Sequence, residues 1–274
     1  MLKTRKKITQ ALNDFSMIEP NDKVMVCVSG GKDSSILLML LKEIQTKAPF
    51  DFHLEAAILD QKQPGFDLVA FETWVTKELQ IKLNVIERDT YSIVKEKITD
   101  GGVYCSLCSR LRRAILYDYA FDHGFHKIAL GHHQDDLIET VLMNMFFTGN
   151  ISSMPPKLKS DDGRNTLIRP LCYVEESDLI AIHKELNFPI IPCNLCGSQE
   201  GLKRKKIKKL LGDLQKEIPS IKQSLLTSLG NVKPSQLMDQ DLWNFHWKRD
   251  LNPEASPSSK TTKEELKQPP SSLQ

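Results

Sequence analysis

The sequence has no long hydrophobic run and almost no excess of charge of either sign. No segment approaches the ~18 apolar residues that a membrane-spanning helix needs, and the first residues, MLKTRKK, lack the apolar core of a secretory signal. Lysine and arginine number 37 against 35 aspartate and glutamate, which leaves a formal charge of +2. We therefore expect a cytoplasmic protein without a membrane partner, in which any attraction to nucleic acid comes from a local patch.

Glycine and proline are not enriched. The 13 glycines and 14 prolines among 274 residues exclude a collagen-like or wholly low-complexity chain. Hydrophobic residues make up 40% and charged residues 26% of the chain, as in ordinary globular proteins. The length fits one large domain with a small appendage.

Short apolar segments alternate with helical patterns along the first half of the chain. The segments with the composition of buried strands are Lys23–Val28, Leu54–Leu59, Leu83–Glu87 and Lys127–Gly131. The helical patterns that follow them are Ser34–Leu41, Leu68–Leu79, Arg110–His123 and Asp135–Phe147. This alternation predicts an α/β protein with a doubly wound, mostly parallel sheet. The polar residues 150–169 are expected to form a long surface loop.

A glycine loop joins the first predicted strand to the helix after it. Free N–H groups at a helix start favour an anion such as phosphate, and glycine lets the backbone approach it closely. Lys32 supplies a positive charge, whereas Asp33 is suited to bind Mg²⁺ or to cap the helix. A simple capped turn is the alternative interpretation. The glycine loop consists of Ser29, Gly30, Gly31, Lys32, Asp33 and Ser34.

Acidic residues follow two other predicted strands. Asp60 ends the second strand, and Gly131 opens the segment GHHQDD, which ends in Asp135 and Asp136 after the fourth. Parallel sheets bind ligands at the carboxyl ends of their strands, and carboxylates suit Mg²⁺. The sequence therefore predicts ligand contacts from these residues, with a solvent-facing strand end for Asp60 and helix capping for the two later aspartates as alternatives.

Cysteines occur as two CxxC pairs and two single residues. In a reducing cytosol such pairs indicate metal or thiol chemistry rather than disulfides, and their spacing leaves zinc and an iron–sulfur cluster open. The single residues stand in apolar segments and are predicted to pack in the core. The pairs are Cys105 with Cys108 and Cys193 with Cys196, and the single residues are Cys27 and Cys172.

The glycine loop and the GHHQDD segment resemble the SGGxDS loop and the GHxxDD segment of the PP-loop, or adenine nucleotide alpha-hydrolase, superfamily. The resemblance implies a Rossmann-like ATP pyrophosphatase fold that binds ATP and Mg²⁺. It implies that the glycine loop holds the pyrophosphate part of ATP, with Asp60 and Gly131 beside the nucleotide. Catalytic roles are expected for Lys32, Asp33, Asp135 and Asp136, which would adenylate an oxygen of the substrate.

Several longer segments resemble the tRNA 2-thiocytidine biosynthesis family, the tRNA-cytidine(32) 2-sulfurtransferases. This resemblance runs from about Ile8 to Leu242. It implies ATP-dependent conversion of cytidine 32 in the anticodon loop of tRNA to 2-thiocytidine, through an adenylated C2 oxygen, with a cysteine desulfurase as sulfur donor. The segments are Asp60–Phe66, Cys105–Arg113, Gly131–Asp136, Met154–Leu158 and Ile191–Gln199.

The same resemblance implies a 4Fe-4S cluster bound by Cys105, Cys108 and Cys196, with Cys193 as the alternative third ligand. A cluster with three cysteine ligands has one iron with an open position that can bind sulfide. A zinc site with four ligands has no such open position. Two rival interpretations remain open from the residues alone. They are another adenylating enzyme of the lysidine synthetase type and a zinc-stabilised RNA-binding module.

A dense basic segment follows the second CxxC pair. Residues Lys203–Lys209 contain six cations in seven positions, on a predicted helix. The apolar residues of this helix that are expected to face the body are Leu202, Ile207, Leu210, Leu211 and Leu214. Such a patch binds RNA phosphates without regard to sequence, and a solvated helix face is the alternative.

These features predict four parts of the chain. Residues 1–20 form a basic N-terminal helix, residues 21–200 a PP-loop domain with the cluster site, and residues 201–250 a basic helical extension. Residues 251–274 form a disordered tail because they contain too few apolar residues to order themselves. Assembly into a homodimer is compatible with this organisation.

Overall fold

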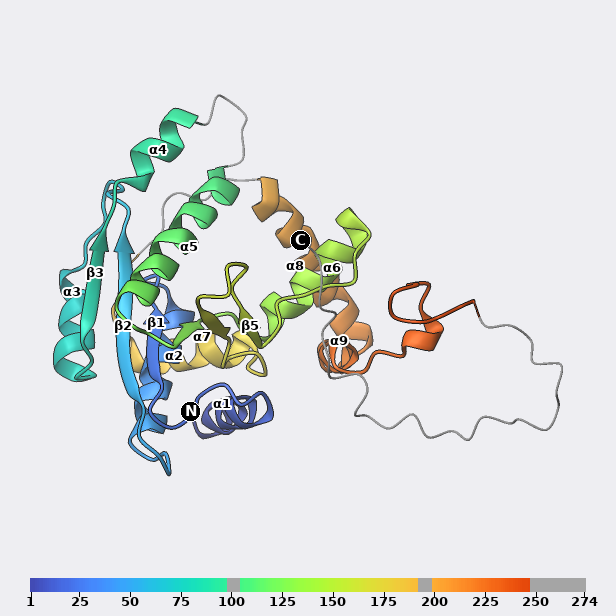
Figure 1. Ribbon diagram of the computed structural model, residues 1–274, viewed down its shortest axis with the longest axis horizontal. Coiled ribbons are helices and arrows are strands. Elements are labelled where there is room, and N and C mark those ends of the chain that lie inside the picture. Colours follow the sequence, from blue (N-terminus) through green and yellow to red (C-terminus); the bar gives the residue numbers. More distant parts are fainter. Residues whose placement is uncertain (98–103, 192–198, 247–274) are drawn as a thin grey trace. The chain divides into compact units, whose positions relative to one another are not determined.

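The computed structural model describes residues 1–97, 104–191 and 199–246, with the side chains of 97, 104–106 and 199–202 left aside. Within these ranges a six-stranded sheet has the order β3-β2-β1-β4-β6-β5 (Figure 1). All neighbouring strands pair in parallel except β5 and β6, which are antiparallel. The strands are β1 (Lys23–Cys27), β2 (His53–Asp60), β3 (Leu83–Glu87), β4 (Lys127–Leu130), β5 (Lys157–Lys159) and β6 (Thr166–Ile168).

Helices cover both faces of this sheet, as the alternation of strands and helices predicts. Successive side chains of a strand point to opposite faces: Val24 and Val26 of β1 belong to one core cluster, and Met25 and Cys27 to another. The helices of the sheet domain are α1 (Leu2–Asp14), α2 (Lys32–Gln45), α3 (Val69–Thr73), the π-helical turn η1 (Trp74–Glu78), α4 (Thr90–Lys97), α5 (Tyr104–Asp122) and α7 (Glu176–Leu186). Helices α2 and α7 pack in the first cluster and α5 in the second, which confirms the doubly wound α/β fold.

Three further helices form a smaller core of their own. They are α6 (Gln134–Thr148), α8 (Gln199–Glu217) and α9 (Ile221–Leu229). Ile138, Val141 and Leu142 of α6 pack against Ile207 and Leu211 of α8. The basic helix is thus attached to the helix that follows β4.

Three details differ from the sequence prediction. The surface loop expected over 150–169 is wrong in part, because β5 and β6 form a hairpin there that extends the sheet beyond β4. Helix α5 begins at Tyr104, so Cys105 and Cys108 lie within the helix rather than before it. Leu210 of α8 is 40% exposed instead of facing the body.

Contacts along the chain define two units, Met1–Gly230 and Asn231–Gln274. The first contains the sheet together with α8 and α9. The described part of the second, up to residue 246, contains a single 3-10 turn, η2 (Pro234–Gln236). The predicted tail 251–274 lies outside the described residues. No helix within the described ranges is long and apolar enough to cross a membrane.

Candidate functional site

The glycine loop lies at the carboxyl end of β1 and leads directly into α2. Gly31 is the N-cap residue of α2 and has no side chain to cap it. The N–H groups of the first helical turn, from Lys32 to Ser34, therefore have no partner within the helix. Gly30 has φ +79°, a left-handed conformation that glycine adopts without strain. The loop thus presents backbone donors and the positive end of a helix dipole to an anion.

Serine hydroxyl groups hold the glycine loop in this shape. The backbone N–H of Ser29 donates to Ser34 Oγ at 3.1 Å. Ser34 Oγ in turn donates to the carbonyl oxygen of Gly31 at 3.2 Å, and Ser35 Oγ donates to the same oxygen at 2.9 Å. These contacts preorganise the loop from its own side chains.

Two other segments touch the glycine loop so closely that only glycine fits. A Cβ on Gly131, the residue after β4, would lie 2.9 Å from the backbone N and Cα of Ser34. A Cβ on Gly30 would lie 2.6 Å from Cβ of Ile191, whose N–H donates to the carbonyl oxygen of Gly30 at 2.8 Å. The ends of β1 and β4 therefore meet at one site. Ile191 forms part of the wall of this site. It is the last described residue before the segment with Cys193 and Cys196.

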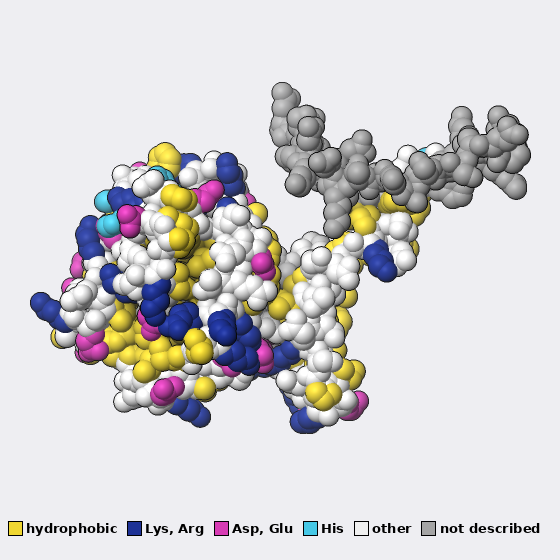
Figure 2. Space-filling model, turned by 90° about the horizontal axis from the view of Figure 1, so that it is seen from below, with side chains coloured by type: hydrophobic (Ala, Val, Ile, Leu, Met, Phe, Trp, Pro, Cys, Tyr) yellow, Lys and Arg dark blue, Asp and Glu magenta, His cyan; other side chains and the backbone are white. Residues whose placement is uncertain are grey.

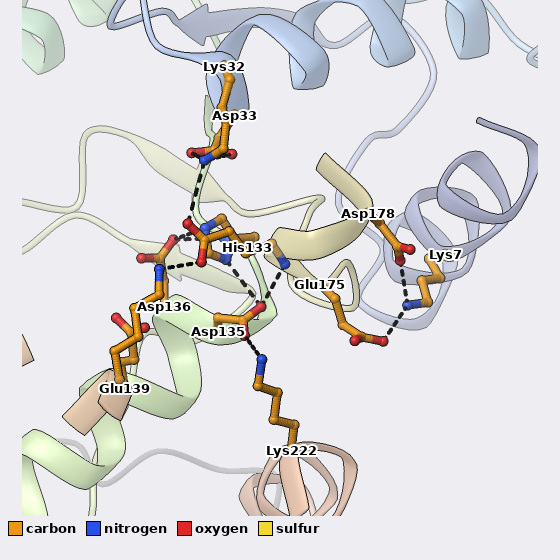
Figure 3. A network of polar contacts seen from close by, with 12 residues as sticks. Lys7, Lys32, Asp33, His133, Asp135, Asp136, Glu139, Glu175, Asp178 and Lys222 are labelled. Carbon is orange, nitrogen blue, oxygen red and sulfur yellow. Dashed lines mark hydrogen bonds and ion pairs between the residues drawn. The ribbon is translucent and has the colours of Figure 1, made fainter. Parts of the chain in front are cut away.

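Lys32 and Asp33 lie at the edge of this site. Lys32 Nζ is 3.0 Å from Asp33 Oδ1 and 3.7 Å from Glu176 Oε1, at the start of α7. Figure 3 shows that Lys32 and Asp33 face the start of α6, where His133 and Asp136 lie. Lys32, the cation of the glycine loop, thus forms ion pairs with the carboxylates of Asp33 and Glu176. Phosphate oxygens of a ligand can replace these carboxylates as its partners.

Asp136 and His133 begin α6 together. The backbone N–H of His133 donates to Asp136 Oδ2 at 3.1 Å, which is a helix-capping contact. Asp136 Oδ1 lies 3.8 Å from Arg204 of α8, and 18% of the Asp136 side chain is exposed. Asp136 therefore caps the helix and still has access to a ligand at the site.

Asp135 has a different environment and is only 4% exposed. Its Oδ1 accepts a hydrogen bond from Lys222 of α9 at 2.6 Å, and its Oδ2 accepts one from the backbone N–H of Glu176 at 2.7 Å (Figure 3). Burial opposes ionisation, but these two hydrogen bonds outweigh it and hold the pKa of Asp135 below its usual range. Asp135 thus joins α6, α7 and α9 as an ionised carboxylate.

The basic helix α8 reaches the same network through two of its cations. Arg204 Nε lies 3.3 Å from Glu139 Oε2, and Lys208 forms an ion pair with Glu176. Burial raises the pKa of Glu139, against the effect of Arg204. Burial, together with the nearby Arg169, lowers the pKa of His132 to about 4, so this imidazole is neutral at pH 7.

Asp60 and Cys108 lie at the carboxyl end of β2. Asp60 accepts hydrogen bonds from the backbone N–H of Lys62 at 2.7 Å and from Lys62 Nζ at 2.9 Å. Gln61 Oε1 accepts from Thr90 Oγ1 and from Cys108 Sγ, both at 3.1 Å. These contacts bring the first CxxC pair on α5 to the same edge of the sheet as the glycine loop.

The cysteines divide into buried and accessible groups. Cys27 and Cys172 are 9% and 0% exposed, which confirms their prediction as core residues. Burial raises the pKa of both thiols to about 12, so they remain protonated. Cys108 is partly exposed. The side chain of Cys105 and the whole of Cys193 and Cys196 lie outside the described residues, and the described side chains alone form no metal-binding group.

Two of the N-terminal cations, Arg5 and Lys7, pair with other helices of the fold, whereas Lys3 and Lys6 are exposed. Lys7 Nζ lies 3.4 Å from Glu175 and 3.2 Å from Asp178 of α7, and Arg5 pairs with Glu43 of α2. A hollow of about 400 Å³ between α1 and the end of α2 is lined by apolar and basic residues. Figure 2, seen from below, shows hydrophobic side chains beside Lys and Arg on this side of the molecule. The hollow includes Phe52, just before β2, and so lies at the edge of the sheet opposite the glycine loop.

Sequence patterns did not identify Glu176 or Lys222 as parts of the site. They singled out the segments that contain Ile191 and Arg204, but did not place these two residues beside the glycine loop and α6. Glu176 stands in the first turn of a helix, where acidic residues are common for reasons of the dipole alone. Their partners are remote in the sequence: Lys222 and Asp135 are 87 positions apart. Only the folded chain brings them together.

Comparisons with known proteins agree with this architecture. A family model for the PP-loop domain matches residues 1–196. A tRNA-cytidine(32) 2-sulfurtransferase from Bdellovibrio bacteriovorus is 65% identical over 244 residues, 89% of this chain and 93% of that protein. One from Coxiella burnetii is 55% identical over 245 residues, 89% of this chain and 94% of that protein.

Among solved structures, the U34-tRNA thiolase NcsA from Methanococcus maripaludis with its 4Fe-4S cluster has a similar fold. Its TM-score is 0.67 at 22% identity, over 84% of this chain and 77% of that one. At this identity the likeness concerns the fold.

Proposed function

The chain belongs to the tRNA-cytidine(32) 2-sulfurtransferase family of PP-loop enzymes, and we propose that it converts cytidine 32 of tRNA to 2-thiocytidine with consumption of ATP. The observation that carries the proposal is the glycine loop at the carboxyl end of β1, where α2 begins without a side-chain cap. The expected setting is the cytoplasm, with the anticodon loop of tRNA as substrate and a cysteine desulfurase as sulfur donor.

The site fits the pyrophosphate part of ATP. The positive φ of Gly30 and the bare N-cap at Gly31 leave a cradle of N–H groups, and a Cβ on Gly30 would collide with Ile191 beside it. Lys32 adds a positive charge that stabilises the charge developing on the phosphates during transfer. Release of Lys32 from Asp33 and Glu176 to the phosphates is the rearrangement that this assignment requires.

For Mg²⁺, the carboxylates of Asp33 and Asp136 are the best-placed ligands. Asp33 belongs to the glycine loop and Asp136 faces it, and both keep some exposure to solvent. Asp135 has each carboxylate oxygen already bonded within the protein, so we assign it the task of holding α6 and α7 in register. Mg²⁺, when bound, supplies positive charge against the phosphate oxygens.

The proposed reaction has two bond exchanges. The C2 oxygen of cytidine attacks the α-phosphorus of ATP, and pyrophosphate leaves. Sulfide, released from the persulfide of the donor by a two-electron thiol reductant, then attacks C2, the C2–O bond breaks, and AMP leaves with the oxygen. Lys32 and the N–H groups of the glycine loop hold the departing pyrophosphate in the first exchange.

Cys105, Cys108 and either Cys196 or Cys193 are the proposed ligands of a 4Fe-4S cluster. Cys108 is accessible, whereas the raised pKa values of Cys27 and Cys172 keep those thiols protonated and unsuited to bind iron. The contact between Ile191 and Gly30 supports a site beside the glycine loop, because Cys193 follows Ile191 by two positions. The cluster, when bound, supplies an iron with an open position that holds sulfur.

The test uses full-length protein purified without oxygen, with iron, sulfide and zinc measured before assay. Zinc at one equivalent without iron would contradict the cluster. Lys32→Ala is expected to abolish ATP-dependent thiolation, while Lys47→Ala, which removes an exposed lysine just beyond α2, leaves it intact. Nucleosides from tRNA of a deletion strain should lack 2-thiocytidine, and an unchanged level would refute the assignment.

A further inference from the structure

Large apolar side chains stand exposed at the end of α6 and just after it. Met145, Phe146, Phe147 and Ile151 are 44%, 55%, 45% and 65% exposed, and we call them the aromatic patch. Exposed apolar surface of this size, gathered within seven positions of the chain, is a candidate interaction site. Exposure leaves these residues without a role in the core of the folded chain.

One cation of α8 lies against the aromatic patch. Lys203 Nζ is 4.9 Å from the ring centroid of Phe147, a favourable cation–π geometry. Lys205, Lys206 and Lys209 of the same helix are exposed. Because Arg204 turns toward acidic groups of the body, these lysines carry the positive charge that α8 presents outward.

Aromatic rings with adjacent cations are suited to single-stranded RNA. Unpaired bases stack on aromatic side chains while lysines bind the flanking phosphates, whereas duplex RNA hides the faces of its bases. We propose that Phe146 stacks against an unpaired base of RNA and that Lys203, Lys205 and Lys206 bind the phosphates beside it. This inference rests on the proposed function, since the single-stranded RNA is then the anticodon loop of the tRNA substrate.

The position of the patch fits a neighbour of the reacting nucleotide. Asp136 lies in the first turn of α6 at the candidate ATP site, and Phe146 is ten positions further along the helix. At 1.5 Å per residue this is roughly 15 Å along the axis. The base on Phe146 is therefore a different base from the one that enters the site, and the contact holds the loop in place.

Variants of Phe146 test the stacking directly. The affinity of the full-length protein is measured, without ATP, for tRNA and for a single-stranded RNA with the anticodon-loop sequence. We expect Phe146→Ala and Phe146→Leu to weaken both by about 10-fold, and Phe146→Trp to bind like the unaltered protein. Phe121→Ala is the matched control. Phe121 lies on α5, is 51% exposed, and has the guanidinium group of Arg164 over its ring.

Salt dependence separates the ring from the lysines. The double variant Lys205→Ala, Lys206→Ala is expected to reduce the slope of log affinity against log salt by about 1.4 for single-stranded RNA. Phe146→Ala should leave this slope unchanged, because it removes no charge. A change of slope in Phe146→Ala would contradict stacking.

Two other outcomes would overturn the inference. Unaltered RNA affinity in Phe146→Ala would remove the ring from the binding surface. Dissociation of an oligomer by Phe146→Ala in sedimentation, with full affinity in Phe146→Leu, would identify the patch as a subunit interface. Failure of the proposed function can be told apart from failure of this inference. If the proposed function is wrong, the unaltered protein forms no 2-thiocytidine, even when Phe146→Ala weakens RNA binding.

Discussion

Replacement of Gly30 by alanine tests whether the contact between the glycine loop and Ile191 shapes the site. Gly30 has φ +79°, and a left-handed conformation costs an alanine roughly 1–2 kcal/mol. The new Cβ would also lie 2.6 Å from Cβ of Ile191, and overpacking of this kind costs roughly 1–3 kcal/mol. We therefore expect a loss of roughly 2–5 kcal/mol in the free energy of unfolding.

Gly124→Ala is the matched control for this experiment. Gly124 has φ +68°, but nothing lies within 4 Å of its added Cβ. It should lose only the backbone part, roughly 1–2 kcal/mol. The free energy of unfolding is measured from urea titrations by linear extrapolation, and ATP binding is measured by calorimetry.

The difference between the two variants isolates the collision with Ile191. Only Gly30→Ala should weaken ATP binding, because only Gly30 lies in the glycine loop. Ile191→Ala should not rescue Gly30→Ala, since the atom that collides is the Cβ that alanine retains. Equal losses of stability in both glycine variants, with ATP binding intact, would refute this reasoning.

Three further predictions follow from buried groups. Lys222→Met leaves Asp135 buried without its cation, and urea titration should show a loss of about 3 kcal/mol, against less than about 1 kcal/mol for Lys216→Met at an exposed pair. Burial opposes ionisation of Glu55, but hydrogen bonds from Asn84, His53 and Lys82 outweigh it and lower its pKa from 4.5 to about 2. The stability that the ionised Glu55 contributes is complete above pH 4.5 and is lost as the pH falls toward 2. In Glu55→Gln the urea midpoint should therefore change less with pH over this interval than in the unaltered protein. Mass spectrometry after treatment with iodoacetamide at mildly alkaline pH should find Cys27 and Cys172 unmodified in the folded protein and alkylated after unfolding, because their pKa values are raised to about 12.

The sequence predicts the central strands well because their signal is local. Lys23–Val28 and Leu54–Leu59 are mainly apolar runs. The first contains β1 (Lys23–Cys27), and the second lies within β2 (His53–Asp60). The hairpin of β5 and β6 escapes such reasoning because its strands have three residues each. Pairing of β6 with β4, about 40 positions earlier, decides its place in the sheet.

The same distinction applies to the candidate site. The glycine loop is contiguous, so its residues and their position between strand and helix are readable from the sequence. The environment of Asp135 is not, because Lys222 approaches from α9 and the Glu176 backbone from α7. Adjacent aspartates that look alike in the sequence thus differ in the fold: Asp136 faces the loop, and Asp135 is enclosed.

One carboxylate has an energetic consequence for ligands on both sides of it. Glu176 faces Lys32 of the glycine loop and Lys208 of α8. When an anion binds Lys32, Glu176 pairs with Lys208 alone and holds it more strongly. When a polyanion binds Lys208, Glu176 pairs with Lys32 and competes there with phosphate. The contribution of Glu176 is therefore antagonistic, and linkage requires that each anionic ligand weaken the other by the same factor.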